Sequence, residues 1–303
     1  MVILYRIYSA LNNYGRSSML RKTIGLFLLL FSVNILAAPI QIVAAENFYG
    51  DLAKTLGGNY VSVISVLKNP NQDPHLFTAS PATARAIANA DIVIYSGINY
   101  DPWMINLLSV DHKKNMHIII VSALLNKKAG ENPHIWYDPK TMPIYADALV
   151  KQLIQLDPVH AIYFQQQLNN FTQQDQSLLN LIQKIRATSQ GISVVATEPV
   201  FNYMATALGL EMHGKSFQLS IMNNTEPSPA AIRDIDDRLK ARQVKLLIYN
   251  NQVINPATER LKNLAKQMNI PIVGVSETQP EGMSYINWMT TELQKIQNIL
   301  KIQ

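Results

Sequence analysis

The segment DPVHAIYFQQQLNNFTQQDQSLLNLIQKIRA, residues 157–187, decides how the fold is organised. Asp157 followed by Pro158 is typical of a helix start, because Asp can cap the first turn and Pro fits the first helical position. No Gly or Pro follows until after Ala187. Apolar residues recur at steps of three and four along this segment, as in an amphipathic helix: Ala161, Phe164, Leu168, Phe171, Leu178, Leu179, Ile182 and Ile185.

A helix of this length is too long to belong to one ordinary lobe. Thirty helical residues would measure about 45 Å. A coiled coil is the alternative interpretation, but the chain contains only this one such segment. The sequence therefore predicts a rod-like helix that connects two lobes.

Short apolar runs alternate with helical patterns on both sides of the long helix. Before it, we expect strands at 40–44, 61–67, 92–95 and 118–121, and helices at 48–56, 81–89, 102–108 and 142–156. After it, we expect strands at 192–196, 244–249 and 270–275, a short polar strand before His213, and helices at 200–208, 229–242, 256–268 and 285–302. This order predicts an α/β fold with parallel sheets whose faces are covered by helices.

Most of the net positive charge of the chain comes from its first 38 residues. The 303 residues include 26 basic and 21 acidic side chains. Four of the basic residues, Arg6, Arg16, Arg21 and Lys22, lie in 1–38, which contains no acidic residue. Without these four, 22 basic side chains face 21 acidic ones, so the sequence gives little support to a nucleic-acid partner.

Residues 1–38 are typical of an export signal. A basic pair, Arg21 and Lys22, precedes an apolar stretch from Thr23 to Ala37, and Ala37-Ala38 offers small residues for cleavage. A single membrane anchor is the alternative, but fifteen apolar residues are short for a span that needs about 20. We expect a periplasmic protein that is cleaved near Ala37-Ala38 and has no stable membrane insertion afterwards; translation could begin at Met1 or Met19.

The absence of cysteine excludes several kinds of structural and functional site. The chain contains no Cys. This excludes a disulfide scaffold, a thiolate metal site, a cysteine nucleophile and a lipid-anchored cysteine.

Four residues with metal-binding side chains follow expected strands. His75 and His134 lie in loops after strands of the first half, and Glu198 and Glu277 immediately follow strands of the second half. Ligands of open parallel sheets bind beyond the carboxyl ends of the strands, so a cleft between two lobes would bring the four together. The alternatives are that the histidines are surface or capping residues, that Glu198 caps a helix, and that Glu277 is solvated.

Two imidazoles and two carboxylates suit a first-row divalent cation. Zinc would be four-coordinate, whereas manganese or iron would use more carboxylate oxygens. A secreted metal-dependent hydrolase or oxygenase could use the same set, but the sequence has no His-Glu-x-x-His helix, nucleophile elbow or phosphate loop. A receptor for a metal chelate such as haem would need a wide cleft lined by aromatic or Arg side chains. A binding protein without catalysis is the favoured reading.

Five short motifs resemble one known family, the cluster A-I solute-binding proteins of bacterial ABC importers for zinc and manganese. DPHLF at 73–77 and HIWYDP at 134–139 are similar to the motifs of its first and second ligands. TEPVF at 197–201 and VSET at 275–278 match its third and fourth ligand positions, and AAENFYG at 44–50 resembles its first helix entry.

The resemblance implies the fold and the role of the protein. It implies two lobes, each with a mostly parallel four-stranded sheet flanked by helices, joined by the long helix. The expected parts are a signal peptide (1–38), an N-terminal metal-binding lobe (39–141), a helical linker (142–190) and a C-terminal metal-binding lobe (191–303). It implies a monomeric, non-enzymatic receptor that uses His75, His134, Glu198 and Glu277 to capture zinc, or alternatively manganese, and delivers it to a membrane permease.

Two departures from the family pattern bear on the metal. Glu277 stands where Asp is commoner, which makes the fourth ligand the least secure. The stretch 126–131 is short and has no His, whereas many zinc receptors of the family carry a His-rich and acid-rich loop there. The second departure weakens the expectation of zinc without removing it.

Overall fold

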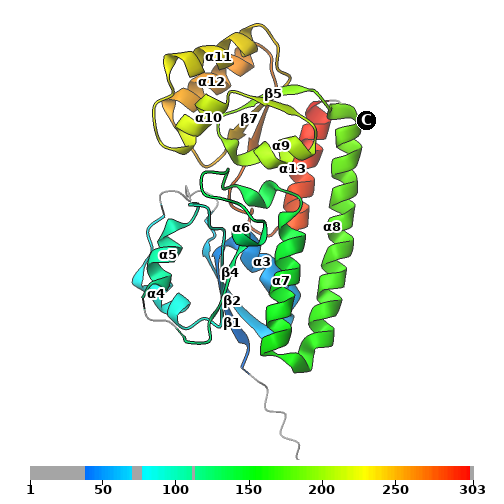
Figure 1. The fold of residues 1–303 in the computed structure, drawn as a ribbon. Helices are drawn as coiled ribbons and strands as arrows, with labels where there is room; N and C mark the ends of the chain where they lie inside the picture. The colour runs from blue at the N-terminus through cyan, green and yellow to red at the C-terminus, as the bar shows by residue number, and fades with distance from the viewer. Residues whose placement is uncertain (1–37, 70–76, 111–112, 301–303) are drawn as a thin grey trace, which may run out of the picture. The chain divides into compact units, whose positions relative to one another are not determined.

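A computed structural model describes residues 38–69, 77–110 and 113–300 (Figure 1). His75 and nearly all of the expected signal peptide lie outside these residues. From Pro39 onward the described chain forms one compact unit. None of its described helices is both long and apolar enough to cross a membrane.

The first sheet has four parallel strands in the order β2-β1-β3-β4. The strands are β1 (Ile40–Glu46), β2 (Val61–Leu67), β3 (Ile92–Tyr95) and β4 (His117–Ile120). The connecting helices are α3 (Asn47–Gly57), α4 (Pro81–Ala88), α5 (Pro102–Leu108) and α6 (Val121–Leu124). α4 begins where the sequence predicts, because the Ser80 hydroxyl accepts a hydrogen bond from the Thr83 N–H and Pro81 occupies the first turn.

The second sheet repeats this arrangement in the order β6-β5-β7-β8, again with all neighbours parallel. Its strands are β5 (Ser193–Ala196), β6 (Glu211–His213), β7 (Leu247–Asn250) and β8 (Ile272–Val275). The helices are α9 (Asn202–Ala207), α10 (Lys215–Met222), α11 (Pro229–Lys240), α12 (Pro256–Gln267) and α13 (Tyr285–Ile299). The sequence did not predict α10, which begins after Gly214 in a left-handed conformation.

The predicted rod is present as α8 (Ala161–Ser189), 29 residues long, preceded by a 3-10 turn at Pro158–His160. It runs beside α7 (Thr141–Leu156) and contacts α3 next to the first sheet and α13 next to the second (Figure 1). The expectation that Asp157 caps this helix is wrong. Its side chain makes no cap hydrogen bond, because Oδ2 lies 2.6 Å from Nδ1 of His160 instead.

One buried cluster spans both sheets. It includes Ile42 and Ile94 of the first sheet and Val194 and Ile248 of the second. Aromatic rings from both halves of the chain pack against one another, with centroids 4.9 Å apart for Phe48–Trp136, 6.1 Å for Phe48–Trp288, 5.7 Å for Tyr137–Trp288 and 5.2 Å for Tyr137–Phe201. The carboxyl ends of the strands therefore have a shared, tightly packed base.

Candidate metal site

Three of the four predicted ligands are described, and all three are buried at the carboxyl ends of strands or in the loops that follow them. His134 precedes α7, Glu198 follows β5 and Glu277 follows β8, with exposures of 1%, 3% and 1%. Full burial rules out the readings of His134 as a surface residue and of Glu277 as a solvated one. Glu198 makes no cap hydrogen bond to the turn that follows it, so the capping alternative is not supported either.

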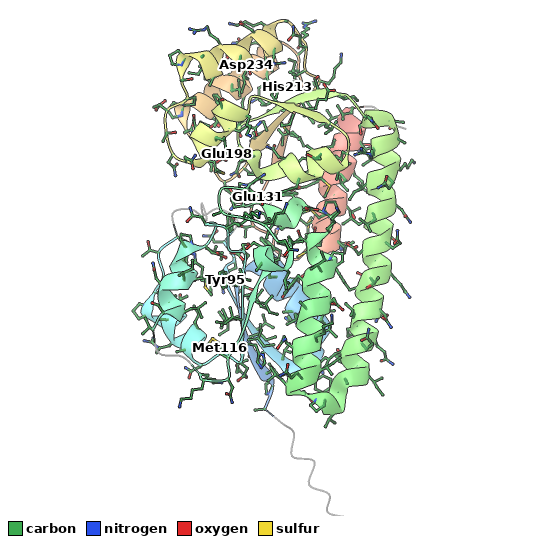
Figure 2. All side chains as sticks on the ribbon, viewed as in Figure 1. Tyr95, Met116, Glu131, Glu198, His213 and Asp234 are labelled. Carbon is green, nitrogen blue, oxygen red and sulfur yellow. The ribbon has the colours of Figure 1, made fainter. Side chains whose placement is uncertain are left out.

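The two halves of the chain meet next to Glu198. Figure 2 labels Glu198 and Glu131 on neighbouring loops of the second and first halves. The Asn132 amide donates a 2.7 Å hydrogen bond to the Pro199 carbonyl, and the Tyr203 hydroxyl donates a 2.9 Å bond to the Asn132 carbonyl. These bonds fasten the His134 loop to the end of β5.

The three side chains converge on one place. Nε2 of His134 lies 3.3 Å from Oε2 of Glu277. The Asn250 amide Nδ2 donates to Oε2 of Glu198 at 2.7 Å and to Oε1 of Glu277 at 2.6 Å. Within 38–69, 77–110 and 113–300, no three His, Asp or Glu side chains form a complete metal-ligand group. The two carboxylates are instead bridged by the neutral amide of Asn250.

Asn132 sets the orientation of the His134 ring. Its Oδ1 accepts from the His134 backbone N–H at 3.1 Å and lies 2.7 Å from Nδ1 of the ring. An amide oxygen can only accept, so this network assigns the proton to Nδ1. Nε2, with its lone pair, is thereby the nitrogen turned toward Glu277, which is the tautomer that a metal-ligating histidine needs.

Glu277 is held by residues from both halves. The Tyr100 hydroxyl donates to its Oε2 at 3.0 Å, and burial together with the charge of Glu277 raises the pKa of Tyr100 well above its ordinary value. Tyr100 is therefore a neutral donor. The Gln252 side-chain oxygen accepts from the backbone N–H groups of Glu277 and Thr278, which fixes the loop after β8.

Asn250, Tyr100 and Gln252 were not predicted from the sequence. Asn250 ends β7 as Glu198 and Glu277 follow β5 and β8, so its place at a strand end was the available signal. Tyr100 and Gln252 gave no such signal, because their roles depend on contacts 177 and 25 residues away along the chain.

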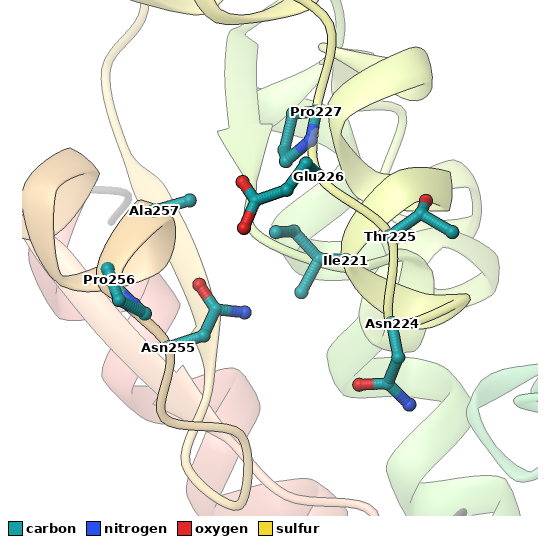
Figure 3. A pocket seen from close by; sticks show the side chains of 8 residues that line it. All are labelled: Ile221, Asn224, Thr225, Glu226, Pro227, Asn255, Pro256 and Ala257. Carbon is teal, nitrogen blue, oxygen red and sulfur yellow. The ribbon is translucent and has the colours of Figure 1, made fainter.

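A surface pocket in the second half lies apart from this site (Figure 3). It is lined by Ile221, Asn224, Thr225, Glu226, Pro227, Asn255, Pro256 and Ala257. None of the three predicted ligands that the structure describes, His134, Glu198 and Glu277, lines it.

The chain matches the family model described as zinc-uptake complex component A, periplasmic, over residues 42–299. The chain belongs to the ZnuA family. This is a family of substrate-binding proteins of metal ABC transporters, so the expectations of that family and of a non-enzymatic role are confirmed.

Relatives match most of the length of this ZnuA-family chain. The manganese ABC transporter substrate-binding lipoprotein PsaA of Streptococcus anginosus is 26% identical over 280 residues, covering 85% of this chain and 88% of PsaA. The periplasmic zinc-binding protein TroA of Treponema pallidum superposes with a TM-score of 0.73 at 20% identity, covering 87% and 99% of the two chains. The Mn-bound S38A mutant of a periplasmic metal-binding protein from Candidatus Liberibacter asiaticus gives a TM-score of 0.71 at 19% identity, covering 86% and 99%.

These comparisons confirm the predicted two-lobe α/β fold. The streptococcal relative is called a lipoprotein, and the present sequence contains no cysteine.

Proposed function

We propose that this metal ABC transporter substrate-binding protein binds zinc as its physiological cargo, through His75, His134, Glu198 and Glu277. The observation that carries the proposal is the convergence of His134, Glu198 and Glu277 from both halves of the chain on one buried place. The fixed tautomer of His134 and the two buried carboxylates together form a donor set for a divalent cation. His75 completes the set as the residue of the DPHLF motif.

A bound metal would relieve the repulsion between the buried carboxylates of Glu198 and Glu277. Two carboxylates that share a single amide donor in a buried place repel one another. A divalent cation would neutralise both charges and would also take the Nε2 lone pair of His134. Because the ligands come from loops on both sheets, binding would draw these loops together, and a permease could read that change.

Manganese is the second candidate. The PsaA relative is named for manganese, two of the proposed ligands are hard carboxylate groups, and 126–131 lacks the His-rich loop. Zinc is favoured because of the family description and the two imidazoles. Intrinsic affinity alone cannot identify the cargo, because zinc outcompetes manganese at most sites of this kind.

We further propose that the protein is exported to the periplasm as a monomer, is cleaved near Ala37-Ala38, and delivers its cargo to a membrane permease. The export of lipoprotein relatives and the leader pattern of 21–38 support this location. Intact-mass measurement of protein from a periplasmic extract tests it: the chain should begin at Ala38 or Pro39, and a chain that keeps the apolar stretch would contradict it.

Growth under chelation tests the choice of metal. A strain that lacks this protein should grow poorly with a chelator and recover with added zinc but not with added manganese. Complementation with the His134→Ala variant should fail, whereas His213→Ala, which changes a half-buried histidine at the end of β6 (Figure 2), should restore growth. Recovery with manganese alone would identify manganese as the cargo.

A further inference from the structure

The loop that carries Tyr100 to Glu277 has an unusual backbone. Three successive residues after β3, Gly97, Ile98 and Asn99, have positive φ angles of 77°, 43° and 66°. The left-handed region is unfavourable for L-residues, and most of all for a β-branched residue such as Ile98. Such a loop persists only when surrounding groups hold it in place.

Asp101 holds the loop from within. Its Oδ2 accepts a 2.6 Å hydrogen bond from the Ser96 N–H and its Oδ1 a 2.9 Å bond from the Gly97 N–H. The Tyr100 N–H also donates to the Gly97 carbonyl at 3.0 Å. Asp101 is 1% exposed, so these bonds are shielded from water and the carboxylate fixes both ends of the turn.

Glu46, the last residue of β1, lies at the level of this turn: β1 and β3 pair with Ala44 opposite Ile94, which places Glu46 two residues further on, beside Ser96, whose N–H donates to Asp101. Glu46 is 2% exposed, its carboxyl oxygens have no close hydrogen-bond donor among the described residues, and the Ser96 hydroxyl stabilises its charge only weakly. A carboxyl group can form a hydrogen bond to a neighbouring carboxylate only by donating its own proton. Burial and the charge of Asp101 raise the pKa of Glu46 well above its ordinary value.

The groups around Glu46 and Asp101 are consistent with one proton shared by these two carboxyl groups. Burial raises the pKa of Asp101 to about 6, while hydrogen bonds from Glu46 and from the backbone of Gly97 and Ser96 oppose the rise. The other titratable groups that interact with Glu46 are the phenols Tyr49, Tyr100 and Tyr145, from α3, the 96–101 loop and α7, whose own pKa values burial raises. Of the two groups, Glu46 has the pKa that is raised further, so a proton shared by the pair resides on Glu46.

We infer that the buried Glu46–Asp101 carboxyl pair positions the metal site: Glu46 donates a hydrogen bond to Asp101, Asp101 holds the 96–101 loop, and the loop holds the Tyr100 hydroxyl against Glu277. Glu46 is a positioning residue, because it acts on the cargo only through this sequence of contacts. The inference rests on the proposed function in that Glu277 is taken as a ligand.

A double-mutant cycle tests the inference, with zinc affinity measured by chelator competition at pH 7. Glu46→Leu removes the donor and should weaken zinc binding about tenfold, and Tyr100→Phe should weaken it by a similar factor. The combined variant should be no weaker than Tyr100→Phe alone, because both changes interrupt the same sequence of contacts. Glu46→Gln should bind zinc within about twofold of wild type, because its amide N–H₂ donates to Asp101 in place of the carboxyl proton.

Asp101→Asn provides the second variant in case Glu46→Leu does not fold. Its side chain keeps one acceptor but presents N–H₂ to the loop or to Glu46, so it should also weaken zinc binding, again non-additively with Tyr100→Phe. Wild-type affinity in Glu46→Leu or Asp101→Asn, or additive losses in the cycle, would overturn the inference. If the wild-type protein itself binds neither zinc nor manganese, the proposed function fails instead.

Discussion

Nε2 of His134 and Oε2 of Glu277 lie 3.3 Å apart, although one residue precedes α7 and the other follows β8. The contact joins the two halves of the chain at the place where the proposed cargo would bind. A substitution on either side of this contact should therefore impair the same site, and the predictions below begin there.

Zinc should raise the melting temperature of the wild-type protein. A ligand that binds only the folded state stabilises it by about 2.7 kcal/mol at a hundredfold excess over the dissociation constant, or roughly 5–10 °C for a chain of this size. His134→Ala and Glu277→Ala should lose most of this rise, as measured by calorimetry with and without zinc. Glu226→Ala, an exposed carboxylate in the separate pocket, is the matched control. A full rise in His134→Ala would show that His134 is not a ligand.

Asn250→Ala should destabilise the metal-free protein more than the zinc-loaded one. The amide of Asn250 bridges Glu198 and Glu277, and its loss leaves two buried carboxylates without their common donor, at a cost of about 1–3 kcal/mol. Zinc would neutralise the same carboxylates, so the rise in melting temperature on adding zinc should be larger than in wild type. Asn251→Ala, which removes the neighbouring exposed amide, should change neither value. A smaller rise in Asn250→Ala would argue against the two carboxylates as joint ligands.

Glu292 should make the metal-free protein less stable as the pH rises. Burial raises the pKa of Glu292 to about 7, although the Tyr137 hydroxyl and the Trp288 N–H each donate to it at 2.8 Å. The folded state therefore retains a proton that the unfolded state loses first. The stabilisation is complete below the ordinary pKa of a glutamate and is lost as the pH rises to about 7, a fall of about 3 kcal/mol.

Urea unfolding of the metal-free protein between pH 4.5 and 7.5 measures this fall. Glu292→Gln should remove most of it, because the variant has no proton to lose at this position. Glu281→Gln, which neutralises an exposed glutamate before α13, should retain it. Parallel pH profiles for Glu292→Gln and wild type would contradict the assignment.

The capping box of α12 should contribute to stability but not to metal binding. Oδ1 of Asn255 accepts from the Thr258 N–H at 2.9 Å, and the Thr258 hydroxyl oxygen accepts from the Asn255 N–H at 3.4 Å. Asn255→Ala should lower the free energy of unfolding by about 1 kcal/mol, while Asn255→Ser should restore most of the loss. Zinc affinity should stay at the wild-type value in both variants. Equal stability of the Ala and Ser variants would show that the side-chain cap contributes nothing.

Sequence periodicity was sufficient to predict the two lobes and the long helix, because their strands and helices depend on local patterns of apolar residues. α8 follows from the spacing of its apolar residues, and β4 is displaced from its predicted range by one residue. The motif loops predicted that His134, Glu198 and Glu277 follow strands, and the structure shows all three buried there. α10 escaped prediction because it has no start signal like the Ser80-Pro81 pair of α4: it begins after Gly214 without a side-chain cap.

The contacts that organise the site could not be predicted, because they join residues far apart in the sequence. Tyr100 and Asn250 are a phenol and an amide, which are not the usual side chains of a metal site. Nothing in the sequence indicates that Glu46 and Asp101 interact, because only the folded positions of β1 and the loop after β3 bring them together. From the sequence, Glu277 was the least secure ligand, yet it is the residue that contacts His134, Tyr100 and Asn250 together.

The aromatic rings that the two halves of the chain share limit how this protein can be recombined with its relatives. Phe48 and Trp136 come from the first half of the chain and Phe201 and Trp288 from the second, and they pack into the same buried cluster. A chimera that joins one half to the other half of a relative would set these rings against foreign partners. Exchange of cargo preference between relatives should therefore succeed by transplanting the ligand loops onto an unchanged interior, and should fail when the crossover is placed within α8.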